Sequence, residues 1–160
     1  MTQSHETPKA SGRCACGAIQ FQMHADPIIT HACHCTWCQR ETGGAFAVNA
    51  LIETDQLRIT AGEPVAVDTP SASGRGQTIV RCPKCHVAVW SHYPGGGPNI
   101  AFVRVGVLEP GHGIRPDAHI FTSTKAPWLP LPDDAPAFEA FYDPAEVWSP
   151  AARQRYAATR

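Results

Sequence analysis

Short runs of β-branched and aromatic residues recur along most of the chain, and turn residues separate them. Runs of this length and composition are typical of strands rather than helices. Two of the separating segments, DTPSASGRG at 68–76 and PGGGP at 94–98, predict flexible hairpin connections. The pattern predicts strands over Ala18–His24, Phe46–Ile52, Leu57–Ala61, Val65–Asp68, Gln77–Arg81, Val87–Tyr93 and Ile100–Val107.

Helical patterns are scarce in this sequence. Only a turn after Cys38 and the tail Ala145–Ala158 suit a helix. The chain of 160 residues contains 15 prolines and 13 glycines, which break it into short pieces and argue against long helices. Its length is that of one domain with a modest core. We therefore predict a mainly β fold of antiparallel sheets with little helix.

The balance of charged residues excludes several classes of partner. The formal net charge is −1, so no basic field would attract nucleic acid or an anionic membrane surface. No apolar run is long enough to span a bilayer. The N-terminal segment MTQSHETPKASG is polar and lacks the apolar core of a secretory signal. These features predict a cytoplasmic protein, in which clustered cysteines are metal ligands more often than disulfides.

Four of the seven cysteines form two pairs. Cys14 and Cys16 make a C-x-C pair before the first predicted strand, and Cys82 and Cys85 make a C-x-x-C pair between two others. A C-x-x-C turn presents two sulfurs to one ion, and zinc readily takes four thiolates in a tetrahedron. The two pairs together predict a closed, structural zinc site.

The remaining three cysteines form a tighter motif. Cys33, Cys35 and Cys38 lie within six residues as C-x-C-x-x-C, so one loop can hold one face of a metal ion. Three thiolates leave the fourth position of a tetrahedral zinc free for water or a substrate. Such a centre can hold an incoming thiol as thiolate or act as a Lewis acid towards an oxygen atom. This triplet predicts a reactive metal site.

Other interpretations of these clusters are an iron–sulfur cluster, a redox-active C-x-x-C pair and ordinary buried cysteines. No βαβ pattern surrounds either pair, which disfavours redox chemistry, and the close spacing disfavours ordinary core residues. A histidine could also replace a thiolate or fill the open position, the candidates being His31, His34 and His86. His34 is the nearest, but a residue between two ligands usually points away from the metal.

Four segments together resemble the glutathione-dependent formaldehyde-activating enzyme family. They are GRCACGAIQF at 12–21, HACHCTWCQR at 31–40, RCPKCHVAVW at 81–90 and HIFTSTKAPWLPLPDDAPAFE at 119–139. The resemblance therefore runs from Gly12 to Glu139. The sequence departs from the family pattern in two ways. His86 stands where a glycine commonly follows the second cysteine of the Cys82-x-x-Cys85 turn, or knuckle. The chain is also shorter than the full enzymes of this family.

The resemblance implies a mainly β architecture of several coiled antiparallel sheets around a zinc-binding hairpin core. It implies two zinc ions, one structural on Cys14, Cys16, Cys82 and Cys85, and one catalytic on Cys33, Cys35 and Cys38. It also implies a zinc-binding domain over residues 12–142, preceded by a flexible tail at 1–11 and followed by a C-terminal extension at 143–160.

The activity of this family joins formaldehyde to glutathione and is classed as a carbon–sulfur lyase for the reverse reaction. The resemblance thus implies a zinc-dependent lyase or synthase that acts on a small thiol adduct, with a small-molecule thiol such as glutathione as its partner. The alternatives are a non-catalytic zinc-binding module and a related enzyme with a different thiol or aldehyde.

Arg40 follows the triplet closely and is the predicted glutathione-binding residue, because a guanidinium can pair bidentately with a carboxylate. It could instead balance thiolate charge or face solvent. In the KAPW segment Lys125 could steer a carboxylate and Trp128 could wall a pocket. The favoured interpretation of that segment is a proline-rich strap with Trp128 packed in the core.

Overall fold

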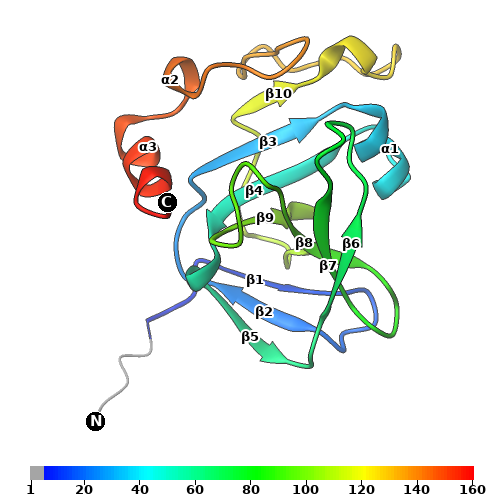
Figure 1. Cartoon of the computed structure of the whole chain (residues 1–160), viewed down its shortest axis with the longest axis vertical. Coiled ribbons are helices and arrows are strands. Elements are labelled where there is room, and N and C mark those ends of the chain that lie inside the picture. Colours follow the sequence, from blue (N-terminus) through cyan, green and yellow to red (C-terminus); the bar gives the residue numbers. More distant parts are fainter. Residues whose placement is uncertain (1–5) are drawn as a thin grey trace.

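The computed structural model describes residues 6–160, and its strands form two sheets (Figure 1). The smaller sheet has the order β1-β2-β5 and the larger β10-β3-β4-β9-β8-β7-β6, so the predicted mainly β class is confirmed. The strands are β1 Ala10–Arg13, β2 Gln20–Met23, β3 Ile29–Cys33, β4 Ala47–Glu53, β5 Leu57–Ala61, β6 Val65–Thr69, β7 Gln77–Arg81, β8 Ala88–His92, β9 Ile100–Arg104 and β10 Ala118–Ile120.

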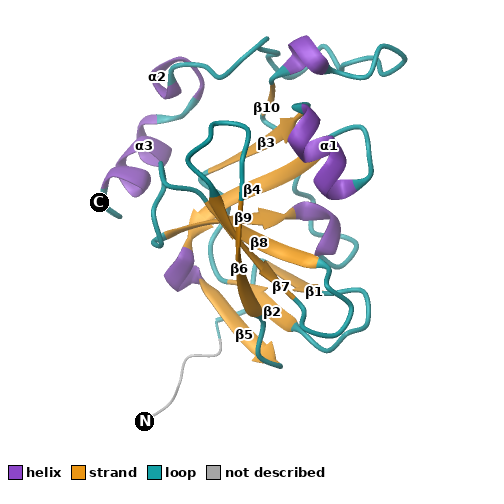
Figure 2. Cartoon of the chain, turned by 45° about the vertical axis from the view of Figure 1, so that its right-hand side comes forward, coloured by secondary structure: helices purple, strands orange, loops and turns teal. Residues whose placement is uncertain are grey.

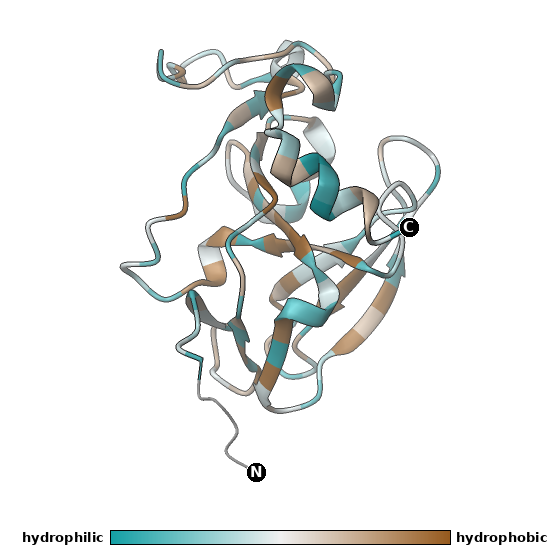
Figure 3. Ribbon diagram, turned by 90° about the vertical axis from the view of Figure 1, so that its left-hand side faces the viewer, coloured by the Kyte–Doolittle hydropathy of each residue, from teal (hydrophilic) through white to brown (hydrophobic). Residues whose placement is uncertain are grey.

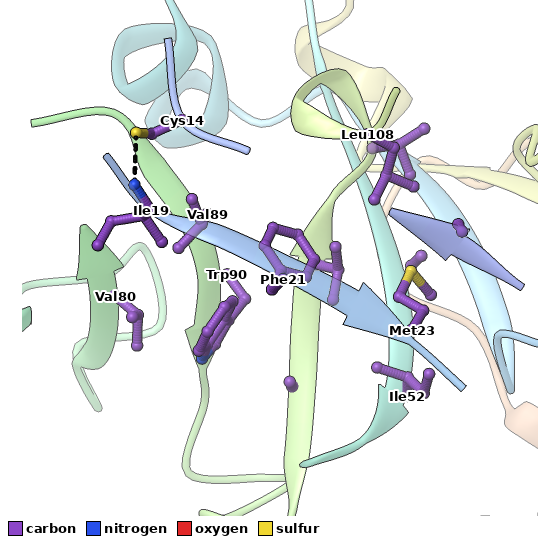
Figure 4. Close-up of a cluster of buried hydrophobic side chains, with 14 of the residues drawn as sticks. Cys14, Ile19, Phe21, Met23, Ile52, Val80, Val89, Trp90 and Leu108 are labelled. Atoms are coloured by element: carbon purple, nitrogen blue, oxygen red, sulfur yellow. Dashed lines mark hydrogen bonds between the residues drawn. The ribbon is translucent and has the colours of Figure 1, made fainter. Parts of the chain in front are cut away.

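One hydrophobic core joins the two sheets (Figure 4). The ring of Phe21 from β2 meets the ring of Trp90 from β8 edge to face, with the centroids 5.4 Å apart, a favourable aromatic geometry. Gly12 on β1 lies so close that an added Cβ would come within 2.5 Å of the Phe21 ring. Cys14 and Cys82 belong to the same buried cluster. The first cysteine cluster is therefore anchored in this core.

Strand β3 is buried along its whole length and lies between β4 and β10. It pairs antiparallel with β4 but parallel with β10, where Ala118 is opposite His31. The predicted antiparallel sheets therefore include one parallel pair, at this edge. The reason is that β10 returns to β3 after a long connection rather than through a hairpin, and such a connection permits parallel pairing.

Helices are few and short, as the prolines and glycines indicate. They are α1 Thr36–Thr42, α2 Pro144–Val147 and α3 Pro150–Ala157, with 3₁₀ turns η1 Thr54–Gln56, η2 Val105–Val107 and η3 Thr122–Thr124. Side chains of Asp143 and Ser149 accept from the first turns of α2 and α3, and a proline follows each cap. The tail predicted as one helical stretch is therefore two helices.

The C-terminal helices lie away from the three-stranded sheet, at the other end of the molecule (Figures 1 and 2). Glu53, at the end of β4, accepts two hydrogen bonds of 2.8 and 2.6 Å from the guanidinium of Arg155 on α3. The hydroxyl of Tyr156 donates to the carbonyl of Gly95 in the β8–β9 loop. These contacts hold α3 against the larger sheet.

The predicted strands agree with the structure in seven places. The bounds of β5 and β7 match the prediction, and those of β2, β4, β6 and β8 differ by one or two residues. Strand β9 ends at Arg104, where the turn η2 replaces the rest of the predicted range. In Figure 3 apolar and polar positions intermingle along the strands, whereas the predictions rest on short runs of β-branched and aromatic residues between turns. Strands β1, β3 and β10 were not predicted.

Two expectations concern the outer parts of the chain. Residues 1–5 of the predicted tail 1–11 lie outside the described residues, and β1 begins at Ala10, inside that range. Among residues 6–160, no helix has the length and apolar character needed to cross a membrane.

Candidate metal centres

Four sulfur atoms meet at the end of the molecule that holds the Phe21 core. The Sγ atoms of Cys14, Cys16, Cys82 and Cys85 lie within 4.8 Å of one another. Sγ of Cys16 is 3.6 Å from that of Cys14 and 3.7 Å from that of Cys82. A tetrahedron with zinc–sulfur bonds of about 2.3 Å has sulfur–sulfur edges of about 3.8 Å. The cluster therefore fits one zinc ion with four thiolate ligands.

Backbone N–H groups point at the sulfurs of this cluster. The N–H of Ile19 donates to Sγ of Cys14 at 3.3 Å, which Figure 4 shows, and the N–H of Lys84 donates to Sγ of Cys82 at the same distance. Such donors favour the thiolate form. The backbone N–H groups of Cys16 and Val87 act in the same direction and lower the pKa of Cys85 to about 6. The loops therefore favour the thiolate form of Cys85. The backbone of Ala18 acts in the same direction at Cys16, but burial and the neighbouring thiols raise the pKa of Cys16 to about 11.

The knuckle between β7 and β8 forces one residue into a strained conformation. His86 has φ +63°, in the left-handed region that favours glycine. Its N–H donates to the carbonyl of Cys82 and its own carbonyl accepts from Arg81, so the turn itself sets this conformation. A non-glycine residue there costs about 1–2 kcal/mol.

Replacing His86 by glycine is expected to stabilise the zinc-loaded protein. The substitution His86→Gly removes the strain but adds freedom to the unfolded chain, so the free energy of unfolding should rise by about 0.5–1 kcal/mol. Chemical denaturation measures the change. His86→Ala is the control, because it removes the imidazole but keeps a Cβ and should bring no such gain. Equal stability of the two variants would rule out backbone strain as the cause.

The second cluster lies where β3 ends and α1 begins. The Sγ atoms of Cys33, Cys35 and Cys38 lie within 4.8 Å of one another, and no fourth His, Cys, Asp or Glu atom from residues 6–160 joins them. Cys35 is the N-cap of α1, and its sulfur accepts from the N–H of Cys38 at 3.3 Å. Hydrogen bonds from the Cys33 and Cys38 thiols lower the pKa of Cys35 to about 2, and the same contacts raise the pKa of Cys33. The triplet thus fits a metal ion with three thiolate ligands.

None of the candidate histidines joins either cluster. His34 is buried, with Nε2 3.0 Å from Nδ1 of His119, and its ring stacks on the His119 ring. His31 forms a hydrogen bond with the hydroxyl of Tyr142, and His86 is exposed beyond the knuckle. His34 therefore points away from the metal ligands, as expected of a residue between two of them.

A cavity of about 560 Å³ lies beside the triplet, and all three of its cysteines line it. Sheet residues such as Leu51 and Phe102 form one wall, while residues 71–73 and 95–96 of two hairpin loops and side chains of α3 form others. The volume lies within the usual range for small-molecule sites. The triplet sulfurs therefore face a space that can hold a small molecule.

A buried arginine lies near the triplet, and the sequence analysis did not identify it. Arg104 on β9 donates to Asn49 Oδ1 and to the hydroxyl of Ser91, and it forms no salt bridge with any acidic group of residues 6–160. The hydrogen bond from Cys33 and the charge of Arg104 both lower the pKa of Cys38, although the contact with Cys35 and burial raise it overall to about 11. Arg104 lies inside the predicted strand Ile100–Val107, where nothing in the sequence distinguishes it from an exposed residue, because its charge is buried only in the folded sheet.

The structure places the predicted substrate residues outside the cavity. Arg40 is exposed on α1 and is not among the lining residues. Nζ of Lys125 donates to the carbonyls of Ala126 and Leu129 in its own strap. Trp128 is 74 % exposed, so it neither packs in the core nor walls this cavity, and the favoured interpretation of Trp128 is wrong. The two arginines that do line the cavity are Arg153 and Arg160.

Two comparisons with known proteins bear on this arrangement. A family model described as glutathione-dependent formaldehyde-activating enzyme matches residues 9–124, which include both cysteine clusters. A crystal structure of a Rhodobacter sphaeroides protein is similar with a TM-score of 0.47 and 22 % sequence identity, over 66 % of this chain and 91 % of that chain.

Proposed function

Because the chain belongs to the glutathione-dependent formaldehyde-activating enzyme family, we propose that it is a zinc-dependent carbon–sulfur lyase or synthase acting on a small thiol adduct. The proposed partner is a small-molecule thiol such as glutathione, joined to formaldehyde or a related aldehyde. We also propose a cytoplasmic location, where the seven free cysteines would stay reduced.

The observation that carries this proposal is that the cluster of Cys33, Cys35 and Cys38 has three sulfur ligands and lines a cavity. Three sulfurs come together without a fourth protein ligand among residues 6–160, and the same three residues line the cavity. Catalytic zinc sites keep one position for substrate, whereas structural sites are closed by four protein ligands. The four-cysteine cluster has the ligand number of a structural site, and the triplet has that of a catalytic site. The triplet also lies beside a cavity walled by the larger sheet.

The proposed reaction is the addition of a thiol to an aldehyde. The carbon–sulfur bond forms, the π electron pair of the carbonyl moves to oxygen, and the thiol proton ends on that oxygen as a hydroxyl group. The reverse reaction breaks the carbon–sulfur bond and returns the proton to sulfur. A zinc ion held by Cys33, Cys35 and Cys38 would supply the Lewis acidity that lowers the pKa of the incoming thiol.

The chain itself contributes position and charge to this chemistry. Cys33 and Cys38 are buried and Cys35 caps α1, so the three sulfurs are fixed by β3 and by the helix. The buried cation of Arg104 offsets part of the negative charge that three thiolates bring. Asn49 and Ser91 hold the Arg104 guanidinium through hydrogen bonds.

Glutathione is expected to bind with its sulfur at the triplet and more tightly as pH rises. The ligand thiol must lose its proton, so its apparent Kd should fall by up to about tenfold per pH unit below the pKa of the thiol, ordinarily near 8.5. Cobalt-substituted protein would report sulfur ligation through its absorption spectrum. S-methylglutathione is the control, because it has no ionisable thiol. It should leave the absorption spectrum of the cobalt-substituted protein unchanged, and its affinity should show no such rise with pH.

The carboxylate-binding role of Arg40 stays a prediction, and the same titration tests it. Arg40→Ala should weaken glutathione more than it weakens a thiol without carboxylates. The absence of a spectral change at millimolar glutathione, together with no acceleration of S-(hydroxymethyl)glutathione formation, would exclude glutathione as the substrate.

A further inference from the structure

The cavity beside the triplet is far larger than formaldehyde requires, and its walls are more apolar than formaldehyde or the polar tripeptide glutathione requires. Formaldehyde is a one-carbon molecule, while the cavity measures about 560 Å³. Seven of its 23 lining residues carry aromatic side chains, namely Trp37, Tyr93, Phe102, Phe121, Phe141, Trp148 and Tyr156. Apolar surface of this kind contributes binding energy only when a ligand removes it from water, at roughly 25 cal/mol per Å². The walls therefore suit a ligand with a sizeable apolar group.

One of these aromatic residues is held in a strained conformation. Phe121 has φ +55°, and His86 is the only other non-glycine residue with positive φ within residues 6–160. A bulky residue in this region costs about 1–2 kcal/mol, and such strain tends to occur at functional sites. The N–H of Phe121 donates to the carbonyl of Ala140, which fixes the backbone beside the C-terminal segment. The strained backbone thus places an aromatic ring in the cavity wall.

The C-terminal segment supplies the remaining wall and its positive charge. The family model ends at residue 124, and residues beyond it, among them Trp148 and Tyr156, line the cavity. Arg153 and Arg160 line it as well, are exposed, and have no salt-bridge partner among the described acidic groups. An exposed residue that also lines the cavity lies at its mouth. The cavity therefore has sulfur ligands inside and two cations at its mouth.

We propose that the carbonyl partner of the reaction is an aldehyde with an aromatic-sized apolar group, and that Arg153 pairs with a carboxylate of the thiol partner. This inference rests on the proposed function. The thiol adds to the aldehyde carbon, the carbonyl π pair moves to oxygen and takes the thiol proton, and no oxidant or reductant is needed. In the adduct, the apolar group lies against the aromatic walls and the carboxylate reaches the mouth.

Two stable thioethers of glutathione test this proposal without catalysis. S-benzylglutathione carries a phenyl ring at the sulfur, and S-methylglutathione carries only a methyl group. Burial of the ring should make S-benzylglutathione bind zinc-loaded protein at least about tenfold more tightly, as measured by calorimetry. Equal affinities, or no binding of either compound at millimolar concentration, would overturn the proposal.

Paired variants locate the contacts. Phe141→Ala removes part of the aromatic wall and should lower the preference for S-benzylglutathione about fivefold, whereas Trp128→Ala, at an exposed position outside the cavity, should not. Arg153→Ala should weaken both thioethers by a similar factor of about three to ten, whereas Arg58→Ala on β5 should weaken neither. Effects of the same size within either pair would contradict the assigned contacts.

A separate measurement distinguishes this inference from the proposed function. The wild-type protein is assayed for adduct formation from glutathione with formaldehyde and with benzaldehyde. A higher kcat/KM for benzaldehyde supports the inference. A higher value for formaldehyde overturns the inference and leaves the proposed function standing, whereas no acceleration with either aldehyde contradicts both.

Discussion

Cys82→Ser is expected to unfold or aggregate the protein. Cys82 is fully buried in the core that joins the two sheets. Its sulfur is one of the four candidate ligands at the closed cluster. A structural zinc ion contributes folding energy directly, about 10–16 kcal/mol in zinc-finger peptides, which exceeds the stability of an ordinary domain. Loss of one ligand should therefore abolish the cooperative thermal transition expected of the wild type. Circular dichroism together with zinc analysis measures this change.

A chelator provides the matched control for this variant. Removing zinc from the wild-type protein should cause the same loss of stability, while Cys82→Ser should respond little to the chelator because its structural site is already impaired. A variant that kept the wild-type melting temperature and the full zinc content would show that these four cysteines do not share a structural ion.

Cys35→Ala is expected to abolish activity while leaving the fold largely intact. Cys35 is half-buried at the triplet, far in sequence from the closed cluster, and its loss leaves only two sulfurs for the metal. Zinc content should fall by about one ion per chain, and adduct formation should drop by about a thousandfold or more, because the reaction then lacks its Lewis acid. Metal analysis, activity and circular dichroism on one sample measure the three effects.

A second substitution, Cys35→Ser, separates the metal-binding role of the Cys35 sulfur from its role as a helix cap. Cys35 also caps α1 by accepting from the N–H of Cys38, and loss of a cap costs about 1 kcal/mol. Cys35→Ser restores a good cap but not a thiolate, so it should regain stability and stay inactive. Unfolding of both variants to the extent seen for Cys82→Ser would instead make the triplet a structural site.

Much of the sheet could be predicted from the chain alone, whereas β1, β3 and β10 could not, each for its own reason. Strands such as β5 and β7 are bounded by glycine, proline or polar turns, so local composition marks their ends. Strand β3 is buried on both faces and lacks an alternating pattern, and β10 has only three residues. Strand β1 has only four residues, and β10 pairs with β3, which is distant in sequence, so no local pattern reveals that pairing.

The site likewise has residues that the sequence indicated and residues that only the structure revealed. Local spacing indicated the metal ligands, because a C-x-x-C or C-x-C turn brings two sulfurs together whatever surrounds it. Arg40 was selected for its nearness in sequence to the triplet, yet the arginines that line the cavity are Arg153 and Arg160 on the C-terminal segment. Arg104 was missed because nothing in its strand distinguishes a buried cation from an exposed one.

By itself, the sequence determined a mainly β chain with two cysteine clusters spaced as metal ligands are, since both properties follow from residue types a few positions apart. Only the tertiary structure decided that no histidine of residues 6–160 joins either cysteine cluster, that Arg104 is buried, and that the C-terminal helices wall the cavity. These outcomes depend on strand pairing and on packing between segments that are distant in sequence. No local sequence pattern specifies which distant segments pack together.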